Sequence, residues 1–210
     1  MLRKIHQSKN ITYDYLILGS NGLLGSEIKK VLSKSKDFSI AKTSSSLNMD
    51  LCNFKKLDNF FNQYKFKYVI NCAAITNLKA CELNKKKAWK INTLLPKKLS
   101  ELSKKNFFKY IHISTDHFFS SKKISYKKET AKTKIINYYS KTKLEAEKYV
   151  KKNKKNLIIR TNFTGFKKKN IQSTFIGWIL FNIIKKNKIK LFVNMYTSTL
   201  DVNTLSKILS

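Results

Sequence analysis

Short apolar runs alternate with longer amphipathic stretches along most of this chain. The runs have the length of buried strands and lie at 16–18, 38–43, 68–70, 109–115 and 157–160. Between them, apolar residues recur at helical spacing over 22–35, after Asn53, over 85–105 and over 138–153. Strands that alternate with helices are typical of a parallel sheet covered on both faces. The pattern therefore predicts a doubly wound α/β fold.

The C-terminal part continues the pattern with weaker signals. It predicts an apolar helix over 174–186, a short strand over 190–193 and a helix from Val202. The apolar pattern of that last helix is still running at Ser210, which indicates a truncated chain. Pro96 lies inside the predicted helix at 85–105, and we expect a break or kink there because proline lacks the N–H that a helix interior uses.

Three of the 5 glycines, Gly19, Gly22 and Gly25, lie between the first predicted strand and the first predicted helix. Glycine permits φ > 0 and lets another group approach the backbone closely. The N–H groups and the positive dipole end of a helix that starts there suit a phosphate or diphosphate. The G-x-x-G-x-x-G spacing differs from the commonest dinucleotide fingerprint, so a purely structural strand-to-helix turn stays an alternative.

The formal net charge is +32, from 44 basic and 12 acidic residues. A charge of this size usually points to nucleic acid or an anionic membrane. However, all of the basic residues except Arg3 and Arg160 are lysines, and they are scattered over the whole chain. Base and bidentate phosphate recognition favour arginine, so we interpret the lysines as compositional drift. The charge still favours anionic ligands such as nucleotide sugars, and a nucleic-acid binder remains an alternative without a motif.

The cysteines Cys52, Cys72 and Cys81 form no C-x-x-C pair, and the three histidines form no metal-ligand pattern. These residues predict neither a metal site nor a disulfide framework, and they suit a reducing compartment. The basic N-terminal stretch has no apolar core of a signal peptide, and no apolar run reaches the 18 residues of a membrane span. We expect a cytoplasmic protein that does not bind a membrane.

Two further stretches carry groups that could react. Tyr139 and Lys143 stand four residues apart on a predicted helix and so share a face. A nearby ammonium stabilises a phenolate and lowers the pKa of the tyrosine, and such a pair can give a proton to a carbonyl that is being reduced. Ser114 and Thr115 end a predicted strand, at the sheet edge where ligands of open α/β sheets bind. An ordinary lysine-rich helix and a strand-terminating turn are the alternatives.

The order of these pieces gives the chain a family resemblance. The matching stretches are LILGSNGLLGSEI, MDL at 49–51, VINCAAITNLKACE, KIN at 90–92, HISTDHFF, YYSKTKLEAEK and IIRTNFTGF. With them the chain resembles the extended short-chain dehydrogenase/reductase family, and within that family the dTDP-4-dehydrorhamnose reductases. The resemblance implies a Rossmann-like domain, which we expect over 1–165, followed by a partial substrate-binding lobe over 166–210.

The resemblance also implies roles for single residues. It implies that Thr115 binds the keto oxygen, that Tyr139 is the general acid, and that Lys143 binds the nicotinamide ribose and tunes Tyr139. The implied cofactor-binding residues are, besides Tyr139 and Lys143, Gly19, Asn21, Gly22, Leu23, Gly25, Lys42, Ser44, Asp50, Leu51, Ala73 and Ala74. Lys42 and Ser44 follow the second predicted strand, where no acidic residue is present to bind a ribose 2′-OH. This favours NADPH, with NADH as the alternative.

The expected function is NADPH-dependent reduction of the 4-keto group of a nucleotide-linked deoxysugar, in the synthesis of surface polysaccharide precursors. One departure concerns the substrate side, because His117 stands where the family usually has a tyrosine. Two alternatives stay open: a nucleotide-sugar epimerase or dehydratase, and a non-catalytic cofactor-binding subunit similar to the regulatory subunit of methionine adenosyltransferase. The sequence leaves the oligomeric state open, a homodimer included.

Overall fold

The structure is a computed structural model that describes residues 11–34, 50–119, 126–166, 174–190, 193 and 196–210. The strand predicted at 38–43 lies outside the described residues, as do 191–192 in the strand predicted at 190–193. No helix in the described part of the chain is long and apolar enough to cross a membrane.

Four parallel strands form the central sheet in the order β1-β2-β3-β4. Their bounds are β1 Ile11–Leu18, β2 Tyr64–Asn71, β3 Lys109–Ile113 and β4 Leu157–Ile159. Leu18 pairs with Asn71, and Asn71 pairs with His112, so the carboxyl ends of the first three strands lie at one edge. The strands β1 and β2 begin earlier than the apolar runs predict, because backbone pairing continues through Thr12 and Lys65.

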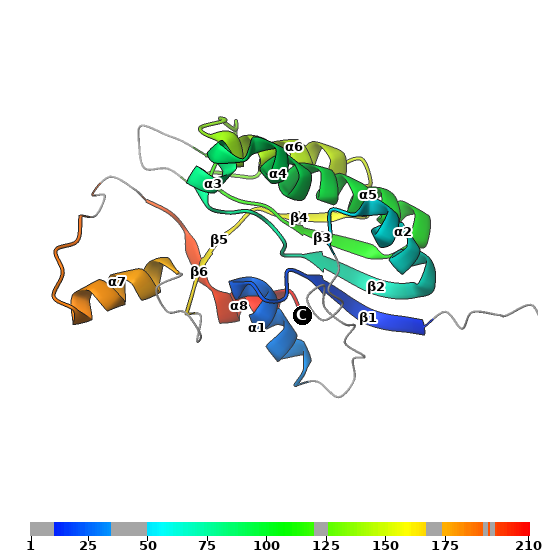
Figure 1. The fold of residues 1–210 in the computed structure, drawn as a ribbon, viewed down its shortest axis with the longest axis horizontal. Coiled ribbons are helices and arrows are strands. Elements are labelled where there is room, and N and C mark those ends of the chain that lie inside the picture. Colours follow the sequence, from blue (N-terminus) through cyan, green and yellow to red (C-terminus); the bar gives the residue numbers. More distant parts are fainter. Residues whose placement is uncertain (1–10, 35–49, 120–125, 167–173, 191–192, 194–195) are drawn as a thin grey trace, which may run out of the picture.

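Helices cover both faces of this sheet, which confirms the doubly wound, Rossmann-like prediction (Figure 1). One face carries α2 Phe54–Gln63, α3 Leu78–Leu83, α4 Lys85–Trp89, α5 Leu95–Asn106 and α6 Tyr138–Val150. The other face carries α1 Leu23–Leu32 and α8 Val202–Ile208. Each face has its own apolar cluster of buried side chains.

The helix α8 packs against α1, although the two are far apart in sequence. Val202, Leu205 and Leu209 lie in the same buried cluster as Leu24 and Ile28. Asp201 caps α8 by accepting hydrogen bonds from the next backbone N–H groups. This C-terminal helix, within the predicted substrate lobe, therefore contributes to the core of the sheet; the domain boundary itself stays a prediction.

The long helix predicted at 85–105 runs through α4, a π-helical turn η1 at Lys90–Leu94, and α5. Pro96 lies in the first turn of α5, directly after the wider π turn. A π turn adds one residue to the helical ring, and such turns often occur at functional sites. Where the sequence predicts a break or kink, the helix instead widens locally into this π turn. It turns Asn92 and Thr93 into the interior, where both are buried.

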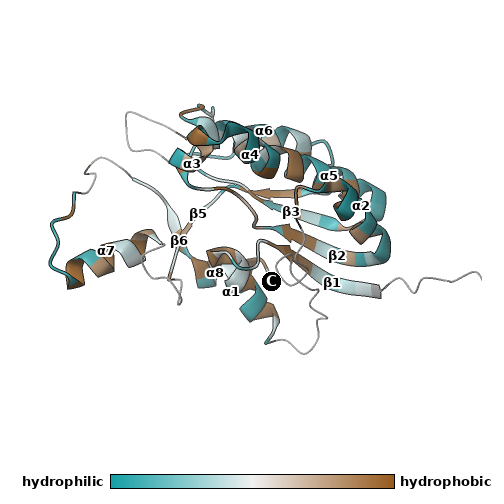
Figure 2. Cartoon of the chain, in the orientation of Figure 1, coloured by the Kyte–Doolittle hydropathy of each residue, from teal (hydrophilic) through white to brown (hydrophobic). Residues whose placement is uncertain are grey.

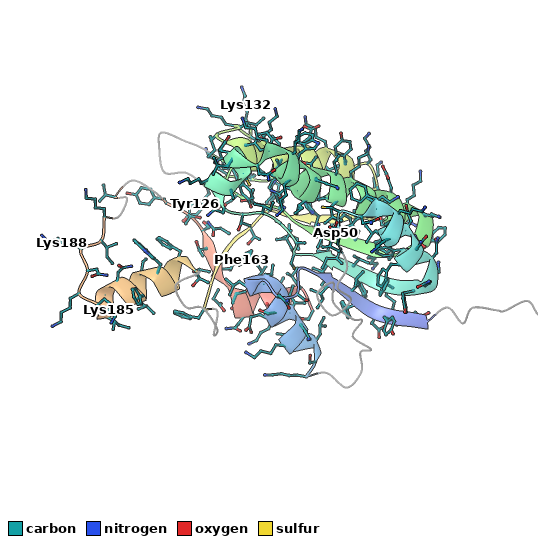
Figure 3. All side chains as sticks on the ribbon, in the orientation of Figure 1. Asp50, Tyr126, Lys132, Phe163, Lys185 and Lys188 are labelled. Carbon is teal, nitrogen blue, oxygen red and sulfur yellow. The ribbon has the colours of Figure 1, made fainter. Side chains whose placement is uncertain are left out.

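Three short elements were absent from the sequence prediction: α3 and the two strands β5 Asn162–Thr164 and β6 Thr199–Asp201. The strands form a separate two-stranded parallel sheet. Phe163 of β5 packs against the cluster between the main sheet and α8 (Figure 3). The helix α7 Phe175–Ile184 lies apart from the main sheet, and Figure 2 shows apolar residues along it.

Candidate functional site

The glycine turn after β1 packs so closely that side chains have no room. Gly19 has φ +76°, and a Cβ built on it would lie 2.7 Å from the backbone nitrogen of Ala73. A Cβ on Gly25 would lie 2.4 Å from the carbonyl oxygen of Gly19. The Gly22 N–H donates to that same oxygen at 2.9 Å. The glycines therefore let the turn and the start of α1 pack directly against the backbone that follows β2, and the free N–H groups at the start of a helix suit a diphosphate.

One cavity of about 590 Å³ joins this turn to the carboxyl edge of the sheet. It brings together seven of the predicted site residues, from the glycine turn, the end of β2, the end of β3 and α6: Gly22, Leu23, Gly25, Ala74, Thr115, Tyr139 and Lys143. Asn71, Cys72 and the stretch 161–164 add to its lining. Open α/β sheets bind ligands in a cleft at the carboxyl ends of their parallel strands, and such clefts are lined by both apolar and polar residues.

The other predicted cofactor residues lie beside this cavity or outside the described chain. Gly19 contacts Ala73 within the turn described above, and Asn21 is exposed next to it. Asp50 is exposed and accepts a hydrogen bond from the Cys52 N–H, while Leu51 packs on the first apolar cluster. Lys42 and Ser44 lie outside the described residues.

The side chains of Thr115 and Tyr139 both line the cavity, and the Thr115 hydroxyl is near enough to act on the pKa of Tyr139. The Thr115 hydroxyl also accepts a hydrogen bond from the His117 N–H at 3.1 Å. Burial raises the pKa of Tyr139 to about 12, and the Thr115 hydroxyl opposes this only in part. Desolvation of the phenol is the largest effect and Lys143 is not among the groups that shift this pKa, so the expected tuning of Tyr139 by Lys143 stays a prediction. Tyr139 is a protonated acid.

The ammonium of Lys143 is buried, with 2% of the residue exposed. Its Nζ donates a hydrogen bond of 2.6 Å to the carbonyl oxygen of Ile113, the last residue of β3. Burial lowers the pKa of Lys143 to about 8, although the Glu147 carboxylate one turn further along α6 opposes this. The pKa of Lys143 is thus much closer to neutral pH than that of an ordinary lysine.

A buried ion pair holds α6 against the end of β4, and a hydrogen bond from the residue after β3 adds to it. Glu147 is 1% exposed and binds Arg160 through two contacts, Oε1 to Nε at 2.9 Å and Oε2 to Nη2 at 2.7 Å. The Ser114 hydroxyl donates to Glu147 Oε1 at 2.7 Å. Burial alone would raise the pKa of Glu147, but the hydrogen bonds from Arg160 and Ser114 together hold it below the ordinary value. Ser114 thus supports α6, while the neighbouring Thr115 faces Tyr139.

Sequence reasoning did not single out Glu147 or Arg160. The available signal was weak: Arg160 is one of only two arginines, and Glu147 follows Lys143 by one helical turn. The π turn adds a second support, because Asn92 Nδ2 donates to Thr142 Oγ1 at 3.2 Å and Thr93 Oγ1 donates to the Thr142 carbonyl at 2.9 Å. The helix α6, which carries Tyr139 and Lys143, is therefore held from two sides.

The described residues contain no group of three or more His, Cys, Asp and Glu side chains that could hold a metal ion. The parallel sheet, the glycine turn at its edge, and the paired Tyr139 and Lys143 on α6 together define the class of extended short-chain dehydrogenases and reductases.

Comparison with known proteins gives the particular family. The chain belongs to the RmlD substrate binding domain family, which matches residues 13–193. A probable low-salt glycan biosynthesis reductase, Agl14 of Haloferax volcanii, is 25% identical over 190 residues, which cover 85% of this chain and 63% of that protein. The chain spans about half to two thirds of the length of the curated relatives that it matches.

Solved structures agree with this assignment. A dTDP-4-dehydrorhamnose reductase from Clostridium acetobutylicum is 30% identical with a TM-score of 0.81, over 93% of this chain and 68% of that chain. A dTDP-4-dehydrorhamnose reductase from Bacillus anthracis, solved in complex with NADP, shares the fold with a TM-score of 0.79 at 21% identity, over 95% of this chain and 70% of that chain.

Proposed function

We propose that this chain binds NADPH and reduces the 4-keto group of a nucleotide-linked deoxysugar. The observation that carries this proposal is the single cavity that is lined both by the glycine turn and by Thr115, Tyr139 and Lys143. The substrate class is supported by relatives that are named dTDP-4-dehydrorhamnose reductase and glycan biosynthesis reductase. Their names also support a role in the synthesis of surface polysaccharide precursors, which we expect in the cytoplasm.

The residues at the glycine turn fit a dinucleotide. Gly22, Leu23 and Gly25 line the cavity at the start of α1, so the backbone N–H groups there can approach a diphosphate. NADP is bound in the neighbouring structure from Bacillus anthracis. The preference for the 2′-phosphate rests on Lys42 and Ser44 and stays a prediction from the sequence. NADPH would supply the hydride for the keto carbon.

The chain itself would hold the keto oxygen and supply the proton. Thr115 and Tyr139 both line the cavity, so an oxygen placed between them can accept hydrogen bonds from both hydroxyls. As the carbonyl oxygen gains negative charge, the proton of the Tyr139 hydroxyl passes to it, and the product is an alcohol. The resulting tyrosinate recovers a proton from water.

Lys143 would act as a cation beside these two groups. Its Nζ is held by the Ile113 carbonyl, the residue two before Thr115. Developing negative charge on Tyr139 and the anionic cofactor both favour the protonated form of Lys143. The Glu147–Arg160 pair keeps the helix that carries Tyr139 and Lys143 at a fixed position on the strand end.

The Tyr139→Phe variant tests the proposal with dTDP-4-dehydro-6-deoxy-L-mannose and NADPH. Removal of the acid should lower kcat by at least roughly 100-fold, while the Kd for NADPH stays within about twofold of wild type, a change below about 0.4 kcal/mol. Tyr138→Phe is the matched control, because the Tyr138 ring contacts Lys85 and Lys141 and is absent from the cavity lining. It should retain wild-type turnover.

Other results would contradict the proposal in distinct ways. Unchanged turnover in Tyr139→Phe would exclude the acid role. A sugar product formed without net NADPH consumption would indicate an epimerase or dehydratase. NADPH binding without turnover of any keto sugar would indicate a non-catalytic cofactor-binding subunit.

A further inference from the structure

His117 lies in the cavity beside the proposed acid. It follows Thr115 by two residues and lines the cavity. Its ring centroid lies 6.0 Å from that of Tyr139, with the planes at 60°. It also replaces the tyrosine that the family resemblance predicts at this position. The side chain is therefore placed to touch a substrate that reacts at Thr115 and Tyr139.

The hydrogen bonds of Asn137 determine which nitrogen of His117 carries the proton. Asn137 caps α6, because its Oδ1 accepts a hydrogen bond from the Ser140 N–H at 2.8 Å. The amide is therefore oriented so that Nδ2 faces His117, at 3.0 Å from Nε2. An amide nitrogen only donates, so Nε2 of His117 must accept and the ring proton must be on Nδ1.

The Nδ1–H of His117 has no hydrogen-bond partner within the part of the chain that the structure describes. A neutral imidazole held in this tautomer can only donate at Nδ1, whereas a tyrosine hydroxyl can donate or accept. The ligand atom that His117 binds through Nδ1 must therefore be a hydrogen-bond acceptor, such as an oxygen.

We propose that His117 is a substrate-binding residue that Asn137 holds as a neutral Nδ1–H donor, and that it binds a hydroxyl or ring oxygen of the keto sugar near the reacting carbonyl. The substrate part of this inference rests on the proposed function, whereas the tautomer follows from the structure alone. Asn137 is a positioning residue, since it caps the helix of Tyr139 and sets the polarity of His117 with one amide.

The other described histidine provides an internal reference with the opposite tautomer. Asn71 Oδ1 accepts from the Ala73 N–H at 3.1 Å, so its Nδ2 donates to the Tyr110 hydroxyl at 3.3 Å. We infer that the Tyr110 hydroxyl donates in turn to His112 Nδ1, 3.1 Å away, while His112 Nε2 is buried and has no partner among the described residues. The proton of the neutral His112 ring is therefore on Nε2.

Long-range ¹H–¹⁵N NMR spectra of the imidazole rings test the tautomers at about pH 8, where an ordinary imidazole is neutral. We expect an Nδ1–H ring for His117 and an Nε2–H ring for His112, and the spectrum of His117→Gln assigns the signals by subtraction. An Nε2–H or a charged His117 ring would overturn the proposal.

Asn137→Asp tests the role of the amide. Aspartate still caps α6, but it offers only acceptors to His117, so the ring proton should move to Nε2. Asn53→Asp is the matched control: Asn53 caps α2 through the same contact, to Lys56 N at 3.1 Å, and should change neither histidine. If His117 stays an Nδ1–H ring in Asn137→Asp, Asn137 does not hold it.

Kinetics test the contact with the substrate. His117→Phe keeps a ring but loses the donor, and its KM for the keto sugar nucleotide should rise about tenfold, the equivalent of one hydrogen bond of about 1.4 kcal/mol. His117→Gln restores a donor and an acceptor and should stay within about threefold of the wild-type KM, a difference below about 0.7 kcal/mol. The Kd for NADPH should not change in either variant.

An unchanged KM in His117→Phe would overturn the substrate contact. Absence of turnover in the wild-type protein would overturn the proposed function and the substrate contact with it. The NMR result would still decide separately whether Asn137 fixes the imidazole.

Discussion

The helix α2 and the helix α7 show how differently two apolar segments of this chain behave. In α2, the Phe61 side chain is fully buried between the sheet and α5 and stacks on Phe108. In α7, which contains no charged residue, Ile184 is 77% exposed and Gly177 is the only buried residue. Lys185 and Lys188 lie beyond its end, away from the main sheet (Figure 3).

The two helices differ in composition, because α2 is amphipathic and α7 is apolar throughout, and they also differ in where the fold places them. The helix α2 leads directly into β2, and its apolar face packs on β2 and α5. The helix α7 follows the short β5, which belongs to the separate two-stranded sheet, and α7 lies apart from the main sheet (Figure 1). All of the predicted site residues within the described chain lie in the sheet and its helical layers, none in α7. We therefore expect substitutions in the two regions to have different effects.

The largest difference should appear in core truncations. Phe61→Ala removes a fully buried ring and should lower the free energy of unfolding by about 3–5 kcal/mol. Ile184→Ala removes an exposed side chain and should change it by less than about 0.5 kcal/mol. Urea unfolding followed by circular dichroism measures both. A large loss in Ile184→Ala would mean that α7 is packed in solution.

The buried ion pair should come next. Glu147→Gln leaves Arg160 without its carboxylate and should cost about 3 kcal/mol. Glu145→Gln is the matched control on the same helix, because its pair with Lys148 is largely exposed and should be worth less than about 1 kcal/mol. Equal losses in the two variants would contradict the supporting role of Glu147.

The same pair predicts a dependence of stability on pH. The pKa of Glu147 in the folded protein lies below its ordinary value of 4.5. The unfolded chain therefore binds the proton more tightly, and the stabilisation is complete above about pH 4.5 and is lost as the pH falls through the folded value. Unfolding experiments at several acidic pH values should show a shallower loss in Glu147→Gln than in wild type; parallel curves would contradict this.

The third effect concerns cofactor affinity. Because burial lowers the pKa of Lys143 to about 8, the ammonium is charged below that pH and neutral above it. The affinity for NADPH should therefore fall by up to about tenfold, or about 1.4 kcal/mol, as the pH rises from about 7 to about 9. Fluorescence titrations of NADPH measure this. Lys143→Met should bind more weakly and without that pH dependence, and a persistent dependence would point to another group.

The smallest effect compares two helix caps. Asn53→Ala removes the cap of α2 and should lower the global free energy of unfolding by about 1 kcal/mol. Thr174→Ala removes the cap of α7, where Thr174 Oγ1 accepts from the Gly177 N–H at 3.2 Å. It should increase hydrogen exchange within α7 and leave the global midpoint unchanged, because local opening of an exposed helix is separate from global unfolding. Equal shifts of the midpoint would contradict this separation.

The sequence predicted the elements with strong periodicity and missed those that are short. The helices α1, α2, α6, α7 and α8 and the strands of the main sheet lie where the apolar patterns place them. The strands β5 and β6 have three residues each, too few for a period of two to appear, and each is defined by its partner. The expected break at Pro96 became a π turn, because Asn92 and Thr93 bond to Ile75 and α6 from within it.

The sequence predicted which residues form the candidate site, but it did not predict how they are arranged in space. Spacing alone indicated that Gly19, Gly22 and Gly25 form a turn and that Tyr139 and Lys143 share a face, since both relations are local. The meeting of these groups in one cavity needs strands that are distant in sequence. The ion pair of Glu147 with Arg160 and the amide of Asn137 against His117 likewise join separate segments, so no local pattern announces them.

By itself, the sequence determined the alternation of strands and helices, the glycine turn, and the face of α6 that carries a phenol and an amine. Only the tertiary structure decided that burial raises the pKa of Tyr139 and lowers that of Lys143, and that Asn137 faces His117 while Tyr110 faces His112. Periodicity and backbone permissiveness are local properties of a chain. Protonation and hydrogen-bond polarity depend on burial and on neighbours that folding brings from elsewhere.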